Sequence, residues 1–307
     1  GAHSPLDLLL GMKKIDEQSF INFEQNILER AAACANEGAK FLHVISPDKH
    51  AVMVDEFPIQ DPIYLGARYV EMLPSVAEFI LYPRLLMQHT DEPVFMRTDT
   101  HNTEYGNVLT SATIVERLLQ KDQSENIRKL LSAEWIDIDR VGDLGGRFEP
   151  PIGEVRKVIK KKWRHDWRHN DLGGGANNGI VDIIFCPESV YPERALIFGD
   201  SFGRDLASIL FFFFREVVFL RTPYFHRDIF DQVKPDVLIT QNVERYLDFC
   251  NPDEMRPSFF MYPHLAQIDY VPEKSFAEAF SAVLSYGRPP YEQFLAKNRL
   301  FVAEESY

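Results

Sequence analysis

Residues 195–206 read ALIFGDSFGRDL, and this stretch decides the fold class. An apolar run typical of a buried strand ends at Gly199-Asp200-Ser201, where a helical pattern begins. Open α/β sheets place ligands at the carboxyl ends of such strands, and a helix N-terminus can stabilise a developing oxyanion. Ser201 is therefore a candidate nucleophile, and Gly199 would permit the tight turn. The alternative is that Asp200 or Ser201 simply caps the helix.

The same alternation of strand and helix extends over much of the chain. Helices are expected where apolar residues recur at helical spacing, and strands where a short apolar run is bounded by turn residues. We expect helices at 16–37, 66–79 (interrupted by a proline), 104–121, 202–216 and 226–233, and strands at 40–46, 93–97, 217–221 and 236–240. This order of elements predicts an α/β fold.

Residues 122–192 break the pattern. They combine charge-rich segments with glycine-rich ones and short β-like runs, which indicates a β-rich insertion. We therefore expect a catalytic domain over residues 1–250, interrupted by this insertion. Residues 251–307, rich in proline and aromatic residues, are expected to form a C-terminal extension packed on the same domain.

Composition limits the possible functions. The chain has 307 residues, of which 45% are hydrophobic, so it can bury a large core. Its net charge of -13 disfavours general binding to nucleic acid, whose phosphates it would repel. Its three cysteines include no CxxC pair, so we expect no metal site. There is no run of 18 apolar residues, so we expect no transmembrane segment, and the start GAHSP is not a signal peptide.

Residues 96–106, MRTDTHNTEYG, hold a second candidate feature. Asp99 and His101 are two residues apart in a polar, turn-like run. A nucleophilic serine needs a base, and the base needs an acid that orients it. An Asp-x-His spacing lets the carboxylate reach the imidazole Nδ1 if the loop turns suitably. The alternative is an ordinary surface loop that contains a histidine.

Together these stretches resemble a known family. RTDTHNTEYG followed about a hundred residues later by ALIFGDSF resembles the alginate O-acetyltransferase group (AlgJ/AlgX-type) of SGNH-hydrolase-like proteins, in which the Asp-x-His pair precedes the serine. Residues 44–52, VISPDKHAV, and 234–247, KPDVLITQNVERYL, also resemble stretches of that group. Ordinary SGNH esterases instead carry Asp-x-x-His near the C-terminus. The resemblance implies an SGNH-hydrolase-like, flavodoxin-like three-layer sandwich with a mainly parallel central sheet and a β-rich insertion.

The resemblance also implies roles for individual residues. Ser201 would be the nucleophile, His101 the base and Asp99 the orienting acid, with the Ser201 N–H in the oxyanion hole. Gly199, Asp200 and Asn177 would support the oxyanion site, Asn177 only as a stand-in for an asparagine block that the sequence lacks. One departure is Asn102, because the family usually has tryptophan after the motif histidine.

The activity implied is transfer of an acetyl group, through an acetyl-serine, to a hydroxyl of an exported and anionic polysaccharide. The alternatives are a carbohydrate acetylesterase with the same triad, or a non-catalytic scaffold or glycan-binding member of an acetylation complex. No cofactor is implied. A membrane-bound protein would supply the acetyl group, and the location would be periplasmic or otherwise extracytoplasmic, with a leader or anchor absent from the given chain; a cytoplasmic location stays open.

A basic run, residues 156–169 (RKVIKKKWRHDWRH), stands out in this acidic chain. Arginine and lysine can pair with carboxylates, and tryptophan rings can stack on sugar faces. The candidate residues for binding an anionic glycan are Trp163, Trp167, Lys161, Arg164 and Arg221. The alternative is a solvated basic segment whose tryptophans pack inward.

Three further features are expected to have a structural and not a functional role. Phe211–Phe214 invite a membrane or partner role, but a helix that is apolar on all sides is usually buried. His43 lies in an apolar run and is expected in the core. Glu244 and Arg245 are expected to form an ion pair at a helix start.

Overall fold

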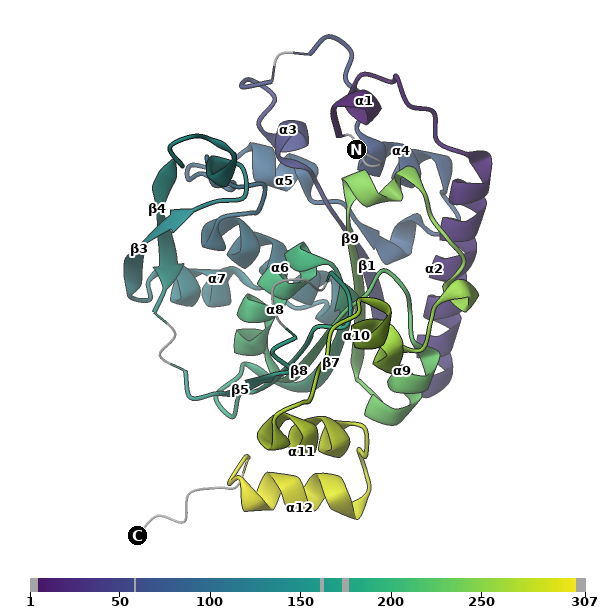
Figure 1. Ribbon diagram of the computed structural model, residues 1–307, viewed down its shortest axis with the longest axis vertical. Helices are drawn as coiled ribbons and strands as arrows, with labels where there is room; N and C mark the ends of the chain where they lie inside the picture. Colours follow the sequence, from purple (N-terminus) through teal and green to yellow (C-terminus); the bar gives the residue numbers. More distant parts are fainter. Residues whose placement is uncertain (1–4, 58, 161–162, 173–176, 302–307) are drawn as a thin grey trace. The chain divides into compact units, whose positions relative to one another are not determined.

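The computed structural model describes residues 5–57, 59–160, 163–172 and 177–301. Its main element is a seven-stranded sheet with the strand order β2-β1-β9-β7-β8-β6-β5 (Figure 1). The strands are β1 (Lys40–Ser46), β2 (Ile80–Leu81), β5 (Asp166–His169), β6 (Val181–Phe185), β7 (Tyr191–Gly199), β8 (Phe214–Arg221) and β9 (Val237–Val243). β1 pairs with β2, and β7 with both β8 and β9, in parallel, whereas β6 runs antiparallel to β5 and β8. The predicted α/β class with a mainly parallel sheet is confirmed.

The helices alternate with these strands along the chain. They are α1 (Pro5–Leu9), α2 (Glu17–Glu37), α3 (Lys49–Val52), α4 (Leu65–Met72), α5 (Arg84–Gln88), α6 (Glu104–Leu119), α7 (Ser124–Leu131), α8 (Ser201–Phe213), α9 (Arg227–Val233), α10 (Tyr262–Leu265), α11 (Lys274–Val283) and α12 (Pro289–Lys297). Contacts group the chain into two compact units. Unit 1 comprises residues 1–31, 42–162 and 241–252, and unit 2 comprises residues 32–41, 163–240 and 253–307. The domain boundaries expected from the sequence stay a prediction.

Within unit 2, alternating strand residues bury both faces of the sheet. Ile183, Leu196 and Val218 face a cluster that includes residues of α9, α11 and α12. On the opposite face, Asp182 is bonded to Arg204 of α8. Since successive side chains of a strand point to opposite faces, helices cover the sheet on both sides. This gives unit 2 the three-layer arrangement expected from the sequence.

The four phenylalanines at 211–214 are divided between two elements. α8 ends at Phe213, and Phe214 already pairs with Tyr191 at the start of β8. The predicted helix to residue 216 is therefore too long, and the strand expected from 217 begins earlier. All four side chains are at most 1% exposed, so the prediction of core burial is confirmed.

Unit 1 packs α2 against β1 and α4. The Phe23 ring lies 5.1 Å from the His43 ring and 4.8 Å from the Tyr69 ring, measured between centroids. His43 is fully buried, as expected. The strand expected at 93–97 is wrong: the structure has only an isolated bridge between Phe95 and Asn102 there.

The segment 122–192 contributes to both sheets. β3 (Trp135–Val141) and β4 (Gly153–Ile159) form a separate antiparallel pair in unit 1, whereas β5 and β6 extend the main sheet. The main sheet therefore recruits part of the segment that the sequence marks as an insertion. This happens because the antiparallel strand β6 pairs directly with β8.

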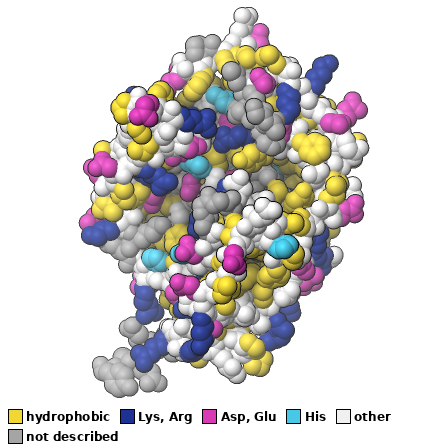
Figure 2. Space-filling view, viewed as in Figure 1, with side chains coloured by type: hydrophobic (Ala, Val, Ile, Leu, Met, Phe, Trp, Pro, Cys, Tyr) yellow, Lys and Arg dark blue, Asp and Glu magenta, His cyan; other side chains and the backbone are white. Residues whose placement is uncertain are grey.

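The molecular surface mixes side chains of every kind. On the face shown in Figure 2, acidic and basic side chains are interspersed with hydrophobic ones. Among the described residues, no helix is both long and apolar enough to cross a membrane.

Candidate active site

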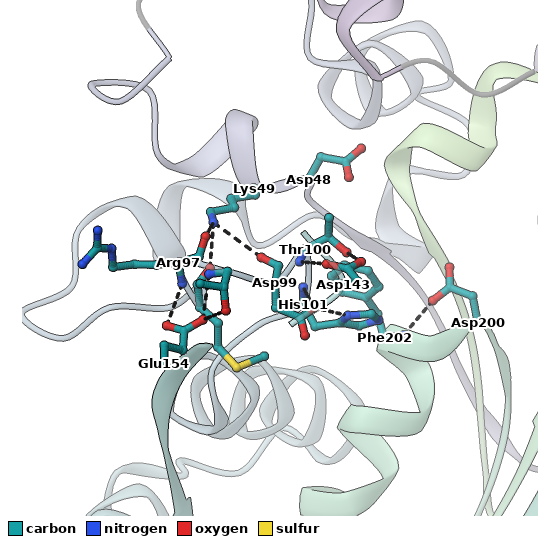
Figure 3. A network of polar contacts seen from close by, with 12 residues as sticks. Asp48, Lys49, Arg97, Asp99, Thr100, His101, Asp143, Glu154, Asp200 and Phe202 are labelled. Atoms are coloured by element: carbon teal, nitrogen blue, oxygen red, sulfur yellow. Dashed lines mark hydrogen bonds and ion pairs between the residues drawn. The ribbon is translucent and has the colours of Figure 1, made fainter. Parts of the chain in front are cut away.

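Asp99 and His101 lie on a tight loop of unit 1. The bridge between Phe95 and Asn102 reverses the chain, and Thr103 then caps α6 by accepting from the N–H of Gly106. Asp99 Oδ1 accepts the backbone N–H of His101 at 3.0 Å, a local turn that short acidic side chains favour. The same oxygen lies 2.7 Å from His101 Nδ1 (Figure 3). The carboxylate and the imidazole therefore meet as the spacing suggested.

This contact determines which ring nitrogen of His101 carries the proton. A carboxylate oxygen only accepts, so Nδ1 carries the proton, and Nε2 of a neutral ring is left as the basic nitrogen. The His101 side chain is 25% exposed, whereas that of Asp99 is buried. Burial alone would raise the pKa of Asp99, but hydrogen bonds from the ring and backbone of His101 outweigh it and hold that pKa well below its usual range. Asp99 is thus ionised, and its carboxylate fixes the orientation of the His101 ring.

Two carboxylates from elsewhere in unit 1 hold the loop around Asp99. Glu154 of β4 accepts the N–H groups of Arg97 at 2.9 Å and Thr98 at 2.7 Å, and also the Thr98 hydroxyl. Asp143 accepts the N–H of Thr100 at 2.8 Å and the Thr100 hydroxyl. These two carboxylates satisfy the amide groups of the loop on either side of Asp99 (Figure 3).

Lys49 of α3 satisfies the carbonyl groups of the same loop. Its Nζ donates to the carbonyl oxygens of Met96 at 2.7 Å, Arg97 at 2.9 Å and Asp99 at 3.4 Å. Burial lowers the pKa of Lys49, against the opposing effect of nearby carboxylates, of which Glu154 acts most strongly. The loop is therefore held through its carbonyls by a cation and through its amides by two anions.

The turn before β4 also fits closely against this loop. The N–H groups of Leu144 and Gly145 both donate to the Thr98 carbonyl, at 3.0 and 2.8 Å. Gly142 lies so close that an added Cβ would stand 2.2 Å from that oxygen and 2.7 Å from Asp99 Cβ. Only glycine leaves room for the loop at this point.

Glu244 and Arg245, expected to form an ion pair, each bond to other partners in the part of the chain that the structure describes. Buried Glu244 accepts the N–H groups of Asp48 at 2.7 Å and Gly66 at 3.0 Å, and the Tyr82 hydroxyl at 2.9 Å. Arg245 instead pairs with the Asp48 carboxylate at 2.6 Å. The end of β9 thereby fixes the turn that carries Lys49. Burial raises the pKa of Glu244 in spite of these hydrogen bonds.

Asn102, the departure from the family pattern, is buried beside the pair. Its Nδ2 donates to Asn107 Oδ1 at 3.2 Å, and its own Oδ1 has no hydrogen-bond partner among the described residues. Asn102 packs into the structure rather than standing at the surface.

Ser201 lies in unit 2, at the first position of α8 and directly after β7. Asp200 is the helix cap: its side chain accepts the N–H of Phe202 at 2.8 Å. Part of the capping alternative is therefore right, because the cap is Asp200 and not Ser201. Gly199 ends β7 and is paired in register with Arg221 at the end of β8. The place of Ser201 in a triad with His101 stays a prediction.

The remaining predicted residues occupy varied positions. Asn177 is exposed in a bend. The Trp163 ring lies 4.7 Å from the Phe212 ring, and Trp167 donates to Asp182 at 3.0 Å, so both contact the core of unit 2. The backbone N–H of exposed Arg164 donates to Glu188, and Lys161 lies outside the described residues. Glycan binding by these residues stays a prediction.

Two groups of side chains in unit 1 have the donor atoms of a metal site. They are Asp48, His50 and Glu244, and Asp99, His101 and Asp143. In both groups the carboxylates already accept hydrogen bonds from the protein, including those from Arg245 to Asp48 and from Thr100 to Asp143. In both groups, protein donors therefore already occupy carboxylate oxygens that a metal ion would need.

Sequence reasoning did not assign Lys49, Asp143 and Glu154 to the site. Lys49 carried a signal, because it lies in the stretch VISPDKHAV that resembles the family. Asp143 and Glu154 carried none, since they lie in the segment interpreted as an insertion.

Comparison with known proteins extends the fold assignment. No protein-family model matches the chain, and no curated protein is similar to it in sequence. PatB1 from Bacillus cereus matches in structure with a TM-score of 0.58 at 11% identity, over 81% of this chain and 94% of PatB1. A PatB1 structure with a sulfonyl adduct gives a TM-score of 0.57. A DHHW family protein from Eubacterium siraeum gives 0.53 at 12% identity, over 72% of this chain and 85% of its own. The chain therefore shares its fold with these proteins.

Proposed function

We propose that this protein is an O-acetyltransferase that moves an acetyl group through Ser201 to a hydroxyl of a polysaccharide. The hydrogen bond between Asp99 and His101 carries the proposal, because it leaves Nε2 of His101 as a base. The motif resemblance to the alginate O-acetyltransferase group and the shared fold with PatB1 support it. So does the sulfonyl adduct of PatB1, since such adducts form when a nucleophile attacks a sulfonyl reagent.

The reaction has two half-steps. Ser201 Oγ attacks the carbonyl carbon of the acetyl donor while Nε2 of His101 takes the hydroxyl proton. The donor's leaving group departs with that proton, and acetyl-serine remains. An acceptor hydroxyl then attacks the acetyl carbon and passes its proton to Nε2, which returns it to Ser201. Asp99 stays ionised throughout and stabilises the transient imidazolium.

The helix N-terminus gives Ser201 a favourable setting for this chemistry. The first N–H groups of α8 lie at the positive end of the helix dipole. They can stabilise the negative oxygen of the tetrahedral intermediate. Asp200 takes one of these groups, that of Phe202, and so holds the start of the helix in place.

The acceptor, the donor and the location are part of the same proposal. The acceptor is an anionic glycan, and a membrane-bound protein supplies the acetyl group. The place of action is extracytoplasmic. These details rest on the motif resemblance.

The decisive experiment measures acetyl release from p-nitrophenyl acetate with and without oligosaccharide acceptors. Ser201→Ala should abolish turnover and the acetylated peptide seen by mass spectrometry. Ser208→Ala is the matched control on the same helix, because the Ser208 hydroxyl donates only to the Asp205 carbonyl among the described contacts. A sulfonyl fluoride should label the wild type and the control but not Ser201→Ala.

The outcomes separate the alternatives. Turnover that oligosaccharides redirect from hydrolysis to acetylated glycan supports the transferase. Hydrolysis that no glycan changes indicates the acetylesterase, and a wild type without turnover or label indicates a scaffold. Full activity in Ser201→Ala would overturn the triad.

A further inference from the structure

Lys49 makes an unusual set of contacts for a lysine so near a candidate catalytic acid. Its ammonium group has three hydrogens, and it lies within hydrogen-bonding distance of three carbonyl oxygens, those of Met96, Arg97 and Asp99. Its contacts are therefore to the backbone of the loop and not to the Asp99 carboxylate. That carboxylate stays available to His101.

Glu154 makes the complementary contacts. One oxygen accepts the Arg97 N–H, and the other accepts both the N–H and the hydroxyl of Thr98. Lys49 and Glu154 thus hold the backbone of residues 96–99 by opposite groups, Lys49 through carbonyl oxygens and Glu154 through N–H groups. Burial lowers the pKa of Lys49, and the nearby negative charge of Glu154 opposes that shift.

The backbone that carries Lys49 is itself held by hydrogen bonds and an ion pair. The preceding residue, Asp48, is held through its N–H by Glu244 and through its carboxylate by Arg245. Glu244 is 2% exposed and belongs to the segment just after β9. A continuous series of bonds therefore runs from the end of β9 through the turn at Asp48 to the loop of Asp99.

We propose that Lys49 is a positioning residue for the Asp99–His101 pair, with Glu154 as its counterpart. Lys49 sets the path of residues 96–99 and so the place where the Asp99 carboxylate meets Nδ1. This inference rests on the proposed function. A displacement of about 1 Å in a catalytic group can reduce turnover by about 100-fold, so the position of Asp99 matters even though Lys49 touches no reacting atom.

The test measures the geometry and the activity separately. In the wild type, proton NMR should show the His101 Nδ1–H at low field, because short hydrogen bonds to a carboxylate deshield the proton. Lys49→Met should shift or broaden this signal and lower kcat by roughly 10- to 100-fold with little change in KM. Lys49→Arg should restore part of the Nδ1–H signal and part of kcat, since the guanidinium group can still donate to two or more carbonyls.

Two further variants keep the result interpretable. Glu154→Gln removes one acceptor and the charge but keeps the size, so it should move the same signal even if Lys49→Met folds poorly. Lys297→Met is the matched control, because Lys297 of α12 forms an exposed pair with Glu278 outside the basic run and should leave signal and kcat unchanged. An unchanged Nδ1–H signal in both Lys49→Met and Glu154→Gln would overturn the proposal. A wild type that shows the signal but no turnover would instead count against the proposed function alone.

Discussion

The backbone N–H of Asp48 donates to Glu244 Oε1 at 2.7 Å across a separation of 196 residues. Glu244 accepts two further hydrogen bonds, from Gly66 and Tyr82, and is buried. This carboxylate therefore gathers three donors from different parts of unit 1. Its importance can be measured directly.

Glu244→Ala should destabilise the protein strongly. It would leave two buried backbone donors and one hydroxyl without their acceptor, and each such group costs about 1–3 kcal/mol. We expect the free energy of unfolding in urea to fall by roughly 3 kcal/mol or more. The control Glu116→Ala, on the exposed face of α6, should change it by less than about 0.5 kcal/mol. Equal stabilities of the two variants would contradict the role of Glu244.

Gly142→Ala should disturb the Asp99 loop. The new Cβ would stand 2.2 Å from the Thr98 carbonyl oxygen, so the backbone must shift, at a cost of about 1–3 kcal/mol. Turnover should fall with stability, because the same atom would press on Asp99. Gly146→Ala is the control: its Cβ would meet only Val141 Cγ1, at an ordinary 3.8 Å. Thermal unfolding and ester turnover of both variants test this, and an unaffected Gly142→Ala would refute it.

Asp99 should make stability depend on pH. Its pKa is lower in the folded protein than in the unfolded chain, so its stabilising contribution is complete above the unfolded value, about 4. The contribution is lost as the pH falls below that value toward the lower folded pKa. The difference in unfolding free energy between the wild type and Asp99→Asn should therefore stay constant above about pH 5 and shrink as the pH falls below about 4. A difference that stays constant over this range would show that the Asp99–His101 contact contributes no such linkage.

Arg194→Met should lower the free energy of unfolding of unit 2. Arg194 is 2% exposed, bonds to Glu216 Oε1 at 2.7 Å and stacks 3.6 Å from the Tyr286 ring centroid. Removing one partner of a buried ion pair costs about 3–5 kcal/mol. The exposed pair of Arg227 with Asp231 offers a control, since Arg227→Met should cost less than about 1 kcal/mol. Urea unfolding followed by fluorescence measures the free energy of unfolding of both variants. Similar losses for Arg194→Met and Arg227→Met would contradict the prediction.

The sequence predicts the fold where its signals are local and periodic. The helix expected at 16–37 is observed at Glu17–Glu37, and that at 104–121 ends two residues early, at Leu119. The failure at Phe214 has a physical reason. An all-apolar run cannot distinguish a buried helix from a buried strand, and the pairing of Phe214 with Tyr191, far away in sequence, decides between them.

The contacts of the candidate site likewise fall into local ones, which the sequence predicts, and long-range ones, which it does not. Asp99 and His101 are two residues apart and meet through their own backbone turn, so their contact could be read from the sequence. The bond from Lys49 to Arg97 spans 48 residues, and that from Glu154 to Thr98 spans 56. Such contacts depend on the tertiary fold, and no local pattern of residues announces them.

The division into two units has a consequence for protein engineering. The chain passes from one unit to the other five times, after residues 31, 41, 162, 240 and 252, and two of these passages fall inside β1 and β9. No single continuous gene fragment encodes either unit. A chimera that exchanges one unit with that of a relative would need several coordinated junctions, two of them within strands of the central sheet.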